Sequence, residues 1–145
     1  MDTLRHNGWK IGIPEGWVDA SQVIVTGPMK DEYSPTINVL QEPLDSPTSP
    51  RAYATEKRAE LQQEFSGQGY EVIEEGPIEI GDEKSFQRTH TWTLPNKNIK
   101  ITQMQVYILR DDKAIIITAT EKSDRFEDMK STFMDALDKF EFVKE

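Results

Sequence analysis

Three strand-like segments follow one another between residues 85 and 120, with only short turns between them. The segment 85–93 alternates in character, the segment 99–109 follows a turn at 94–98, and the apolar segment 114–120 follows a turn at 110–113. Consecutive strands joined by turns this short pair in antiparallel fashion. An antiparallel meander is therefore the centre of the predicted fold.

Further strands and two helices surround this meander in the sequence. The segments 9–13, 21–26, 36–41 and 70–80 have strand character and end at Gly or Pro. Ser49 and Pro50 are a typical helix start, and this helix should run to about Phe65. A second helix should begin at Ser123 or Asp124, and its apolar face holds Phe126, Met129, Phe133, Leu137 and Phe140. We expect one α+β domain over residues 1–145, with an antiparallel sheet of about six or seven strands packed by two helices.

The charge and the missing cysteines exclude several functions. The formal net charge is −9, from 26 acidic and 17 basic residues. Phosphate backbones and anionic lipid surfaces attract basic clusters, and this chain has none longer than Lys57-Arg58, so we expect neither as a partner. Because the chain reaches a strand-like segment by Trp9, we also expect no direct membrane span. Because the chain has no Cys, thiolate catalysis, thiolate-bound zinc and disulfides are excluded.

No group of residues in the sequence has the pattern of a catalytic or metal site. His6 and His90 are isolated from each other and from paired carboxylates, whereas a metal site needs several converging ligands. Gly67-Gln68-Gly69 follows a predicted helix, where it is better interpreted as a helix stop than as a phosphate loop. We expect no catalytic residues, no metal and no cofactor. An enzyme or small-molecule binder that uses His90 and Arg88 remains an alternative.

One strand face mixes apolar and amide side chains. In the strand 99–109, Met104, Val106 and Ile108 fall on one side, which should be core. The other side contains Gln103, Gln105 and Tyr107, and we expect both glutamines to face outward. Similar mixed rows occur at Asn38 and Leu40 and near Ile24. Such a row is either a half-solvated sheet face under a helix or a shallow binding surface for a peptide or helix.

The order of these landmarks resembles the DcrB-related family over nearly the whole chain. The resemblance rests on Ile13-Pro14-Glu15-Gly16-Trp17, the segment 38–44 before a helix with Tyr53, the strand with Gln103 and Gln105, and the final helix. The family resemblance implies the PsbP-like fold, an αβα sandwich around an antiparallel sheet.

The same resemblance implies a non-enzymatic binding protein. One branch of the family consists of cytoplasmic chaperones of type VI secretion, which form dimers and shield hydrophobic helices of secreted effectors in a cradle made by the sheet. The implied partner is a hydrophobic helical segment of a protein client, with a homodimer as one possible assembly. The residues expected to line the cradle are Ile24, Asn38, Leu40, Gln103, Gln105 and Tyr107, with Gln62 at its rim. The alternative is a periplasmic or envelope accessory protein of the lipid-anchored branch, if an export signal has been removed. Because no signal-peptide pattern precedes Trp9, we expect the cytoplasm.

Overall fold

The meander forms the middle of the sheet. The computed structural model describes residues 1–143. Its three central strands are β6 (Glu83–Leu94), β7 (Ile99–Arg110) and β8 (Lys113–Lys122), and each pairs antiparallel with the next. The turn between β7 and β8 places Asp111 at φ 57°, in the left-handed region that Asp tolerates. The predicted meander is confirmed.

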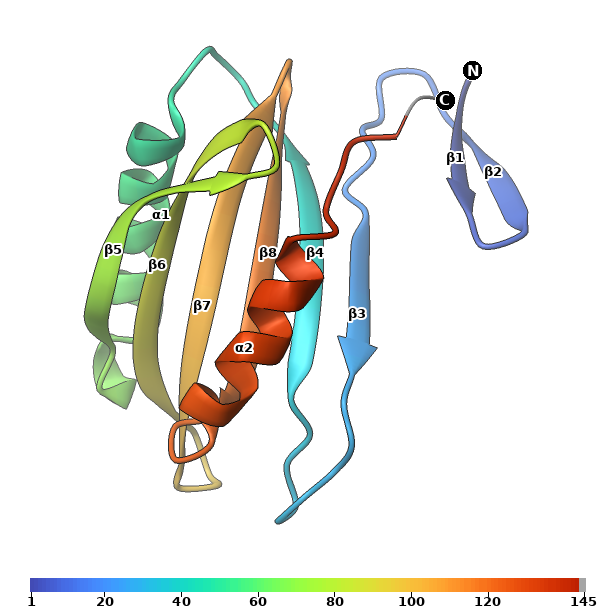
Figure 1. The fold of residues 1–145 in the computed structure, drawn as a ribbon. Helices are drawn as coiled ribbons and strands as arrows, with labels where there is room; N and C mark the ends of the chain where they lie inside the picture. Colours follow the sequence, from blue (N-terminus) through green and yellow to red (C-terminus); the bar gives the residue numbers. More distant parts are fainter. Residues whose placement is uncertain (144–145) are drawn as a thin grey trace.

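Three more strands complete a six-stranded antiparallel sheet in the order β3-β4-β8-β7-β6-β5 (Figure 1). The added strands are β3 (Gln22–Thr26), β4 (Thr36–Pro43) and β5 (Glu71–Ile80). β3 and β5 are therefore the two edges. β5 is one strand with a bulge between Val72 and Glu74, which settles whether 70–80 forms one strand or two.

The strand at 9–13 lies outside this sheet. It is β2 (Trp9–Ile13), and it pairs with β1 (Asp2–His6) in a separate two-stranded sheet. We call residues 1–13 the hairpin. The sequence interpretation had no strand before Trp9, whereas the Asn7-Gly8 turn, with both φ angles positive, brings residues 2–6 back against β2.

The helices cover opposite faces of the six-stranded sheet (Figure 1). α1 (Pro50–Glu64) begins as predicted, and the Ser49 hydroxyl accepts a hydrogen bond from Ala52 N at 3.1 Å. A short 3₁₀ turn, η1 (Ser66–Gln68), and Gly69 at φ 73° follow α1. No helix within residues 1–143 is long and apolar enough to cross a membrane.

The start predicted for the second helix is wrong by one or two residues. α2 (Phe126–Leu137) has Arg125 as its N-cap and no side-chain capping bond. The Ser123 hydroxyl is instead 2.8 Å from the Thr102 hydroxyl of β7, so it is not available as a cap. Phe140 lies beyond the end of α2 but still packs against the core.

Each face of the sheet has its own core. Under α2, Met104, Val106 and Ile108 are buried as predicted, together with Phe133. The opposite face has a smaller core of Tyr53, Ala54, Phe86, Tyr107, Ala114 and Ile116. With these two layers of helix around one sheet, the αβα architecture that the family resemblance implies is confirmed.

Candidate functional site

A groove runs beside α1 because this helix covers only part of its sheet face. α1 packs on β6 and β7, while β4 and β8 continue the same face beyond it (Figure 1). The space left between helix and sheet has a volume of about 550 Å³. Its floor comes from β4, β6, β7 and β8, and its helix wall comes from Lys57, Glu60, Leu61, Glu64 and Phe65. We call this space the groove.

The floor of the groove is a ladder of amides and hydroxyls. Gln103 donates from Nε2 to the Thr120 hydroxyl at 3.1 Å, and Gln105 donates to the Thr118 hydroxyl at 3.2 Å. These residues face each other across β7 and β8 in the antiparallel register. Next to Thr118 on β4, Asn38 Oδ1 is buried and has no hydrogen-bond partner among the described residues. Asn38 therefore adds a buried, unpaired acceptor beneath the paired amides of the floor.

One network fixes the orientation of Gln103. The indole Nε1 of Trp92, which can only donate, is 3.2 Å from Gln103 Oε1. That oxygen must therefore accept, so His90 Nε2, at 2.8 Å, carries a proton and donates as well. His90 Nδ1 then accepts from the Tyr70 hydroxyl at 3.2 Å.

His90 is held neutral by this arrangement. Its side chain is fully buried. Burial lowers the pKa of His90 to about 4, with the hydrogen bond to Gln103 opposing this shift and the nearby Arg88 charge adding to it. Both ring nitrogens have partners, and neither reaches solvent.

A second network surrounds Arg88, which is also fully buried. It donates to Glu75 at 3.1 Å and to the Tyr107 hydroxyl at 2.8 Å, and its third bond goes to the carbonyl of Ala54 in α1. The Tyr107 hydroxyl in turn donates to Gln105 Oε1 at 2.5 Å. Burial raises the pKa of Tyr107 to about 12, although the Arg88 charge opposes the shift. This network ties α1 to the sheet and holds Gln105 in place.

Aromatic contacts and ion pairs complete the helix wall. Phe65 stacks on Trp92 with ring centres 4.0 Å apart, and Tyr53 meets Tyr107 edge to face at 6.0 Å. Lys57 pairs with Glu42 at 2.6 Å and with Glu60 at 3.5 Å. Burial lowers the pKa of Lys57, but these two carboxylates outweigh it and raise the pKa above its usual value.

The structure brings five of the seven expected residues into one place. Asn38, Leu40, Gln103, Gln105 and Tyr107 all line the groove. We expected both glutamines to face outward. Instead, both are half-buried and hydrogen-bonded to a neighbouring strand.

The two other expected residues lie outside the groove lining. Ile24 pairs with Asn38 in register, but it is on the edge strand β3 and 54% exposed. Gln62 is exposed on α1 and does not line the groove.

Several lining residues escaped the sequence interpretation. Among them are Trp92 and Phe65, and the sequence pattern could have identified both. Trp92 shares the alternating row of Arg88 and His90, and Phe65 ends the apolar spacing of the first helix.

The groove offers recognition groups but no catalytic arrangement that we can identify within residues 1–143. His90 and Arg88 are buried and already bonded, so neither can contact a substrate in this state. In the same part of the chain, no group of three or more His, Asp or Glu side chains is placed to hold a metal ion. What remains is a concave, mixed apolar and amide surface.

Comparisons with known proteins agree on one fold. The family model DcrB matches residues 10–139, while no curated protein matches the sequence. A crystal structure of a Pseudomonas aeruginosa protein of unknown function is similar with a TM-score of 0.83 at 15% identity, over 100% of this chain and 99% of that one.

Two more distant structures share the fold. The solution structure of cyanobacterial PsbP from Synechocystis sp. PCC 6803 has a TM-score of 0.59 at 12% identity, over 92% of this chain and 99% of that one. The Saccharomyces cerevisiae Ran-binding protein Mog1p has a TM-score of 0.52 at 14% identity, over 81% of this chain and 70% of that one. At these identities the neighbours show the fold, and the family model places the chain in the DcrB family.

Proposed function

Because this chain belongs to the DcrB family, we propose that it is a chaperone or adaptor that shields a hydrophobic helical segment of a secreted effector, in association with type VI secretion. The observation that carries this proposal is the groove, which combines apolar walls with an amide floor. Its volume of about 550 Å³ is open along one side of α1, so a segment of another chain can enter from the side.

The apolar part of the groove suits the client's hydrophobic side chains. Leu61 and Phe65 on the helix face Leu40 and Ile116 on the sheet across the groove. Burying apolar surface contributes about 25 cal/mol per Å². This non-directional term favours any apolar helix, so it supplies affinity without selecting the client.

The polar part suits the client's small polar side chains and supplies selectivity. Gln103 and Gln105 are already positioned by their strand neighbours, and each donates only one printed hydrogen bond from its amide nitrogen. Each amide nitrogen has a second hydrogen, which a Ser, Thr or Asn oxygen on the buried face of the client helix can accept, whereas a purely apolar helix leaves it without a protein partner. Glu60 and Glu64 line the helix wall, so basic residues flanking the client segment are also favoured.

The binding test uses Trp92 as a reporter inside the groove. The chain has three Trp residues, so Trp9→Phe with Trp17→Phe leaves Trp92 alone. We expect its fluorescence to change on titration with a synthetic apolar helical peptide of about 20 residues with Lys at both ends. The same peptide with a central Pro should leave the signal unchanged, because Pro breaks the helix.

A matched pair of variants locates the contact. Leu61→Glu places a charge on the helix wall and should weaken peptide binding at least tenfold. Ile73→Glu makes the same kind of change on the exposed part of β5 and should leave binding intact. If both variants bind the peptide with equal affinity, the groove is not the binding site.

Co-purification from the native host separates the two branches of the family. Recovery of a large secreted protein with apolar amino-terminal helices supports the chaperone, and cell fractionation should then find this protein in the cytoplasm. Recovery of envelope proteins alone supports an accessory role in the envelope instead.

A further inference from the structure

The carboxyl-terminal end of α1 carries charges that the helix itself disfavours. The aligned peptide groups of a helix place partial negative charge at this end, so acidic side chains are unfavourable there. Glu60 and Glu64 nevertheless lie in the last two turns of α1, and its last turn contains no basic residue. Both residues line the groove. This part of the groove wall is therefore negative, at a place where the helix dipole adds to the negative charge.

The basic residue of the groove wall lies toward the other end of α1. Lys57 is about two helical turns before Glu64. It pairs with Glu42 of β4 at 2.6 Å and with Glu60 at 3.5 Å. Lys57 is thus compensated by two carboxylates, whereas the last turn of α1 offers Glu64 no basic residue. The negative charge of the groove wall is therefore concentrated where α1 ends.

Hydroxyl groups gather at one end of the groove floor. Thr36 of β4 and Thr120 of β8 face each other in the antiparallel register, and Tyr33 lies in the loop just before β4. All three residues line the groove, and we call them the hydroxyl cluster. A helix leaves its first four N–H groups without partners inside the helix. Hydroxyl oxygens are typical acceptors for such groups, because they cap helix amino termini.

The hydroxyl cluster and the end of α1 lie at the same end of the groove. Phe65, the residue after α1, stacks on Trp92 of β6. Trp92 pairs with Ile101, and Ile101 pairs with Lys122, which is two residues beyond the hydroxyl cluster along β8. Figure 1 agrees, since α1 ends at the same end of the sheet as the loop between β3 and β4. Acceptor oxygens and carboxylates are therefore combined at this end.

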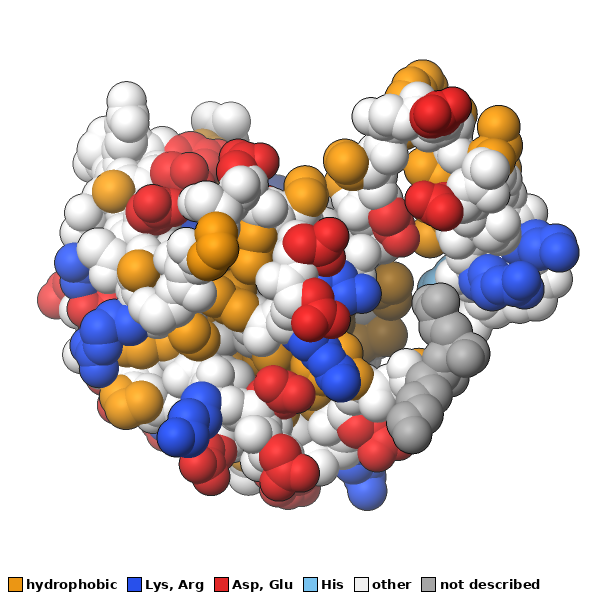
Figure 2. Space-filling view, turned by 90° about the horizontal axis from the view of Figure 1, so that it is seen from above, with side chains coloured by type: hydrophobic (Ala, Val, Ile, Leu, Met, Phe, Trp, Pro, Cys, Tyr) orange, Lys and Arg blue, Asp and Glu red, His pale blue; other side chains and the backbone are white. Residues whose placement is uncertain are grey.

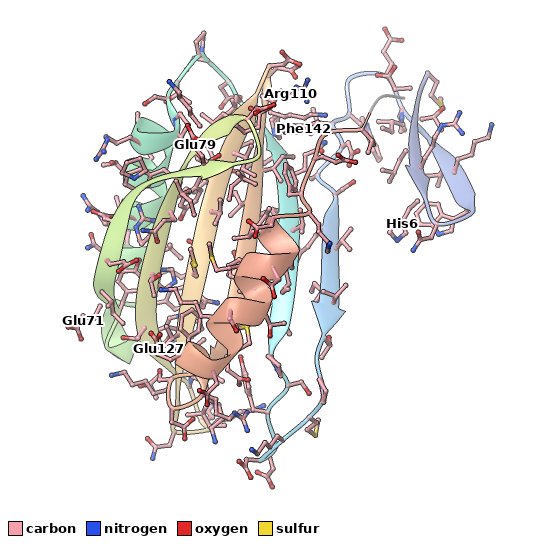
Figure 3. The ribbon with its side chains drawn as sticks, in the orientation of Figure 1. His6, Glu71, Glu79, Arg110, Glu127 and Phe142 are labelled. Atoms are coloured by element: carbon pink, nitrogen blue, oxygen red, sulfur yellow. The ribbon has the colours of Figure 1, made fainter. Side chains whose placement is uncertain are left out.

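The opposite end of the sheet is mixed in charge. Arg110, the last residue of β7, is labelled there in Figure 3. The β7–β8 turn at residues 110–113 contains two basic and two acidic residues, so it has no net charge. Figure 2 looks onto this end, and both acidic and basic side chains lie on it. The end at Glu64 is therefore the one that favours a positive partner.

We infer that a client helix lies in the groove antiparallel to α1, with its amino-terminal end at Glu64 and the hydroxyl cluster. The inference rests on the proposed function, because it specifies how the client occupies the same groove. The first N–H groups of the client helix can donate to the hydroxyl oxygens. The partial positive charge of that helix end offsets the carboxylates of Glu60 and Glu64. The reverse orientation would place a partial negative charge against them.

The orientation is tested with the protein in which Trp92 is the only Trp. A nitroxide label, which quenches fluorescence at short range, is attached to either the amino or the carboxyl end of the apolar helical peptide. Because Trp92 lies at the end of the groove where α1 ends, the amino-end label should quench it more strongly at saturation. Equal quenching, or stronger quenching by the carboxyl-end label, overturns the orientation and leaves the proposed function standing. If neither labelled peptide binds, measured by calorimetry, the proposed function is wrong and this inference falls with it.

Glu64→Gln tests the charge with little change in shape. It should weaken peptide binding by roughly two- to fivefold, the factor that one charge at a helix end supplies. Its unfolding midpoint should not fall, because α1 loses an unfavourable charge, so weaker binding cannot reflect a damaged fold. Glu56→Gln is the matched control on the same helix, since Glu56 is exposed and outside the groove lining. Unchanged binding by Glu64→Gln, or equal weakening by Glu56→Gln, overturns the inference.

Discussion

The two faces of the six-stranded sheet are made by the same strands but differ in chemistry. Under α2, β7 contributes Met104, Val106 and Ile108 to a continuous apolar core. Under α1, the alternate residues Gln103, Gln105 and Tyr107 belong to hydrogen-bonded networks that border an open groove. Strand alternation therefore lets one face stabilise the fold while the other holds polar groups ready for a partner.

The contact between each helix and the sheet shows the same difference. α2 buries Phe126, Phe133 and Leu137. α1 buries only Tyr53 and Ala54, and it is also held by the bond from Arg88 to the Ala54 carbonyl. Truncating a side chain should therefore reduce stability more on the α2 side than on the α1 side.

The largest effect is expected under α2. Phe133 is fully buried, and Phe133→Ala should lower the free energy of unfolding by about 3–5 kcal/mol, because it leaves a cavity in the core. Chemical denaturation followed by circular dichroism measures this loss. Leu61→Ala, on the groove wall of α1, is the control and should cost clearly less. Equal losses would show that both faces stabilise the fold to the same degree.

The second effect concerns His90 and depends on pH. Because its pKa is about 4 in the folded state against 6.5 when unperturbed, the unfolded chain binds more protons between these values. Stability should therefore fall as pH decreases through this window. For His90 alone, the loss between about pH 7.5 and pH 5 is about 2 kcal/mol.

His90→Gln removes this titration and keeps hydrogen-bonding groups at the site. Denaturation at both pH values should give a smaller pH dependence for His90→Gln than for the wild type. His6→Gln changes the other histidine, in the hairpin, and should behave like the wild type. If His90→Gln and the wild type lose the same stability, His90 is not held neutral by the fold.

The sequence predicted the α2 face better than the α1 face, for a physical reason. Periodicity alone predicts the burial of Met104, Val106, Ile108 and Phe133, because a row of apolar side chains is favourable only when it packs in the core. The same alternation correctly put Gln103, Gln105 and Tyr107 on the other face. It could not show that the glutamines are half-buried, since that depends on Thr118 and Thr120 of the next strand.

Other features depended on contacts distant in sequence. Arg88 was weighed as a possible reactive group, but it is buried because Glu75, Tyr107 and the Ala54 carbonyl meet around it. Ile24 was assigned to the site from strand alternation, and Gln62 was placed at its rim on the family resemblance. Where α1 and β3 lie relative to the groove cannot be read from a pattern. The hairpin is different, because Asn7-Gly8 is a strong local turn signal that the sequence interpretation did not use.

The smallest effect on stability is expected on the groove floor. Gln103→Leu with Gln105→Leu removes the amide ladder and leaves three donors without their acceptors, the Trp92 indole N–H, the His90 Nε2–H and the Tyr107 hydroxyl. Water in the groove can reach only some of these donors, but the two leucines add apolar burial that offsets part of the loss, so the free energy of unfolding should fall by about 1–2 kcal/mol. Unfolding should stay cooperative, since the apolar core under α2 is untouched.

The same double variant should change recognition more than stability. Without the amides, the groove loses its preference for a helix with polar residues on the buried face, while its apolar walls still bind. Titration with two peptides, one with Ser and Asn on the apolar face and one with Ala in their place, measures this preference by Trp92 fluorescence. The wild type should prefer the polar peptide, and the double variant should bind both with similar affinity. If the preference persists, the amides serve only to join the strands, and both faces of the sheet are structural.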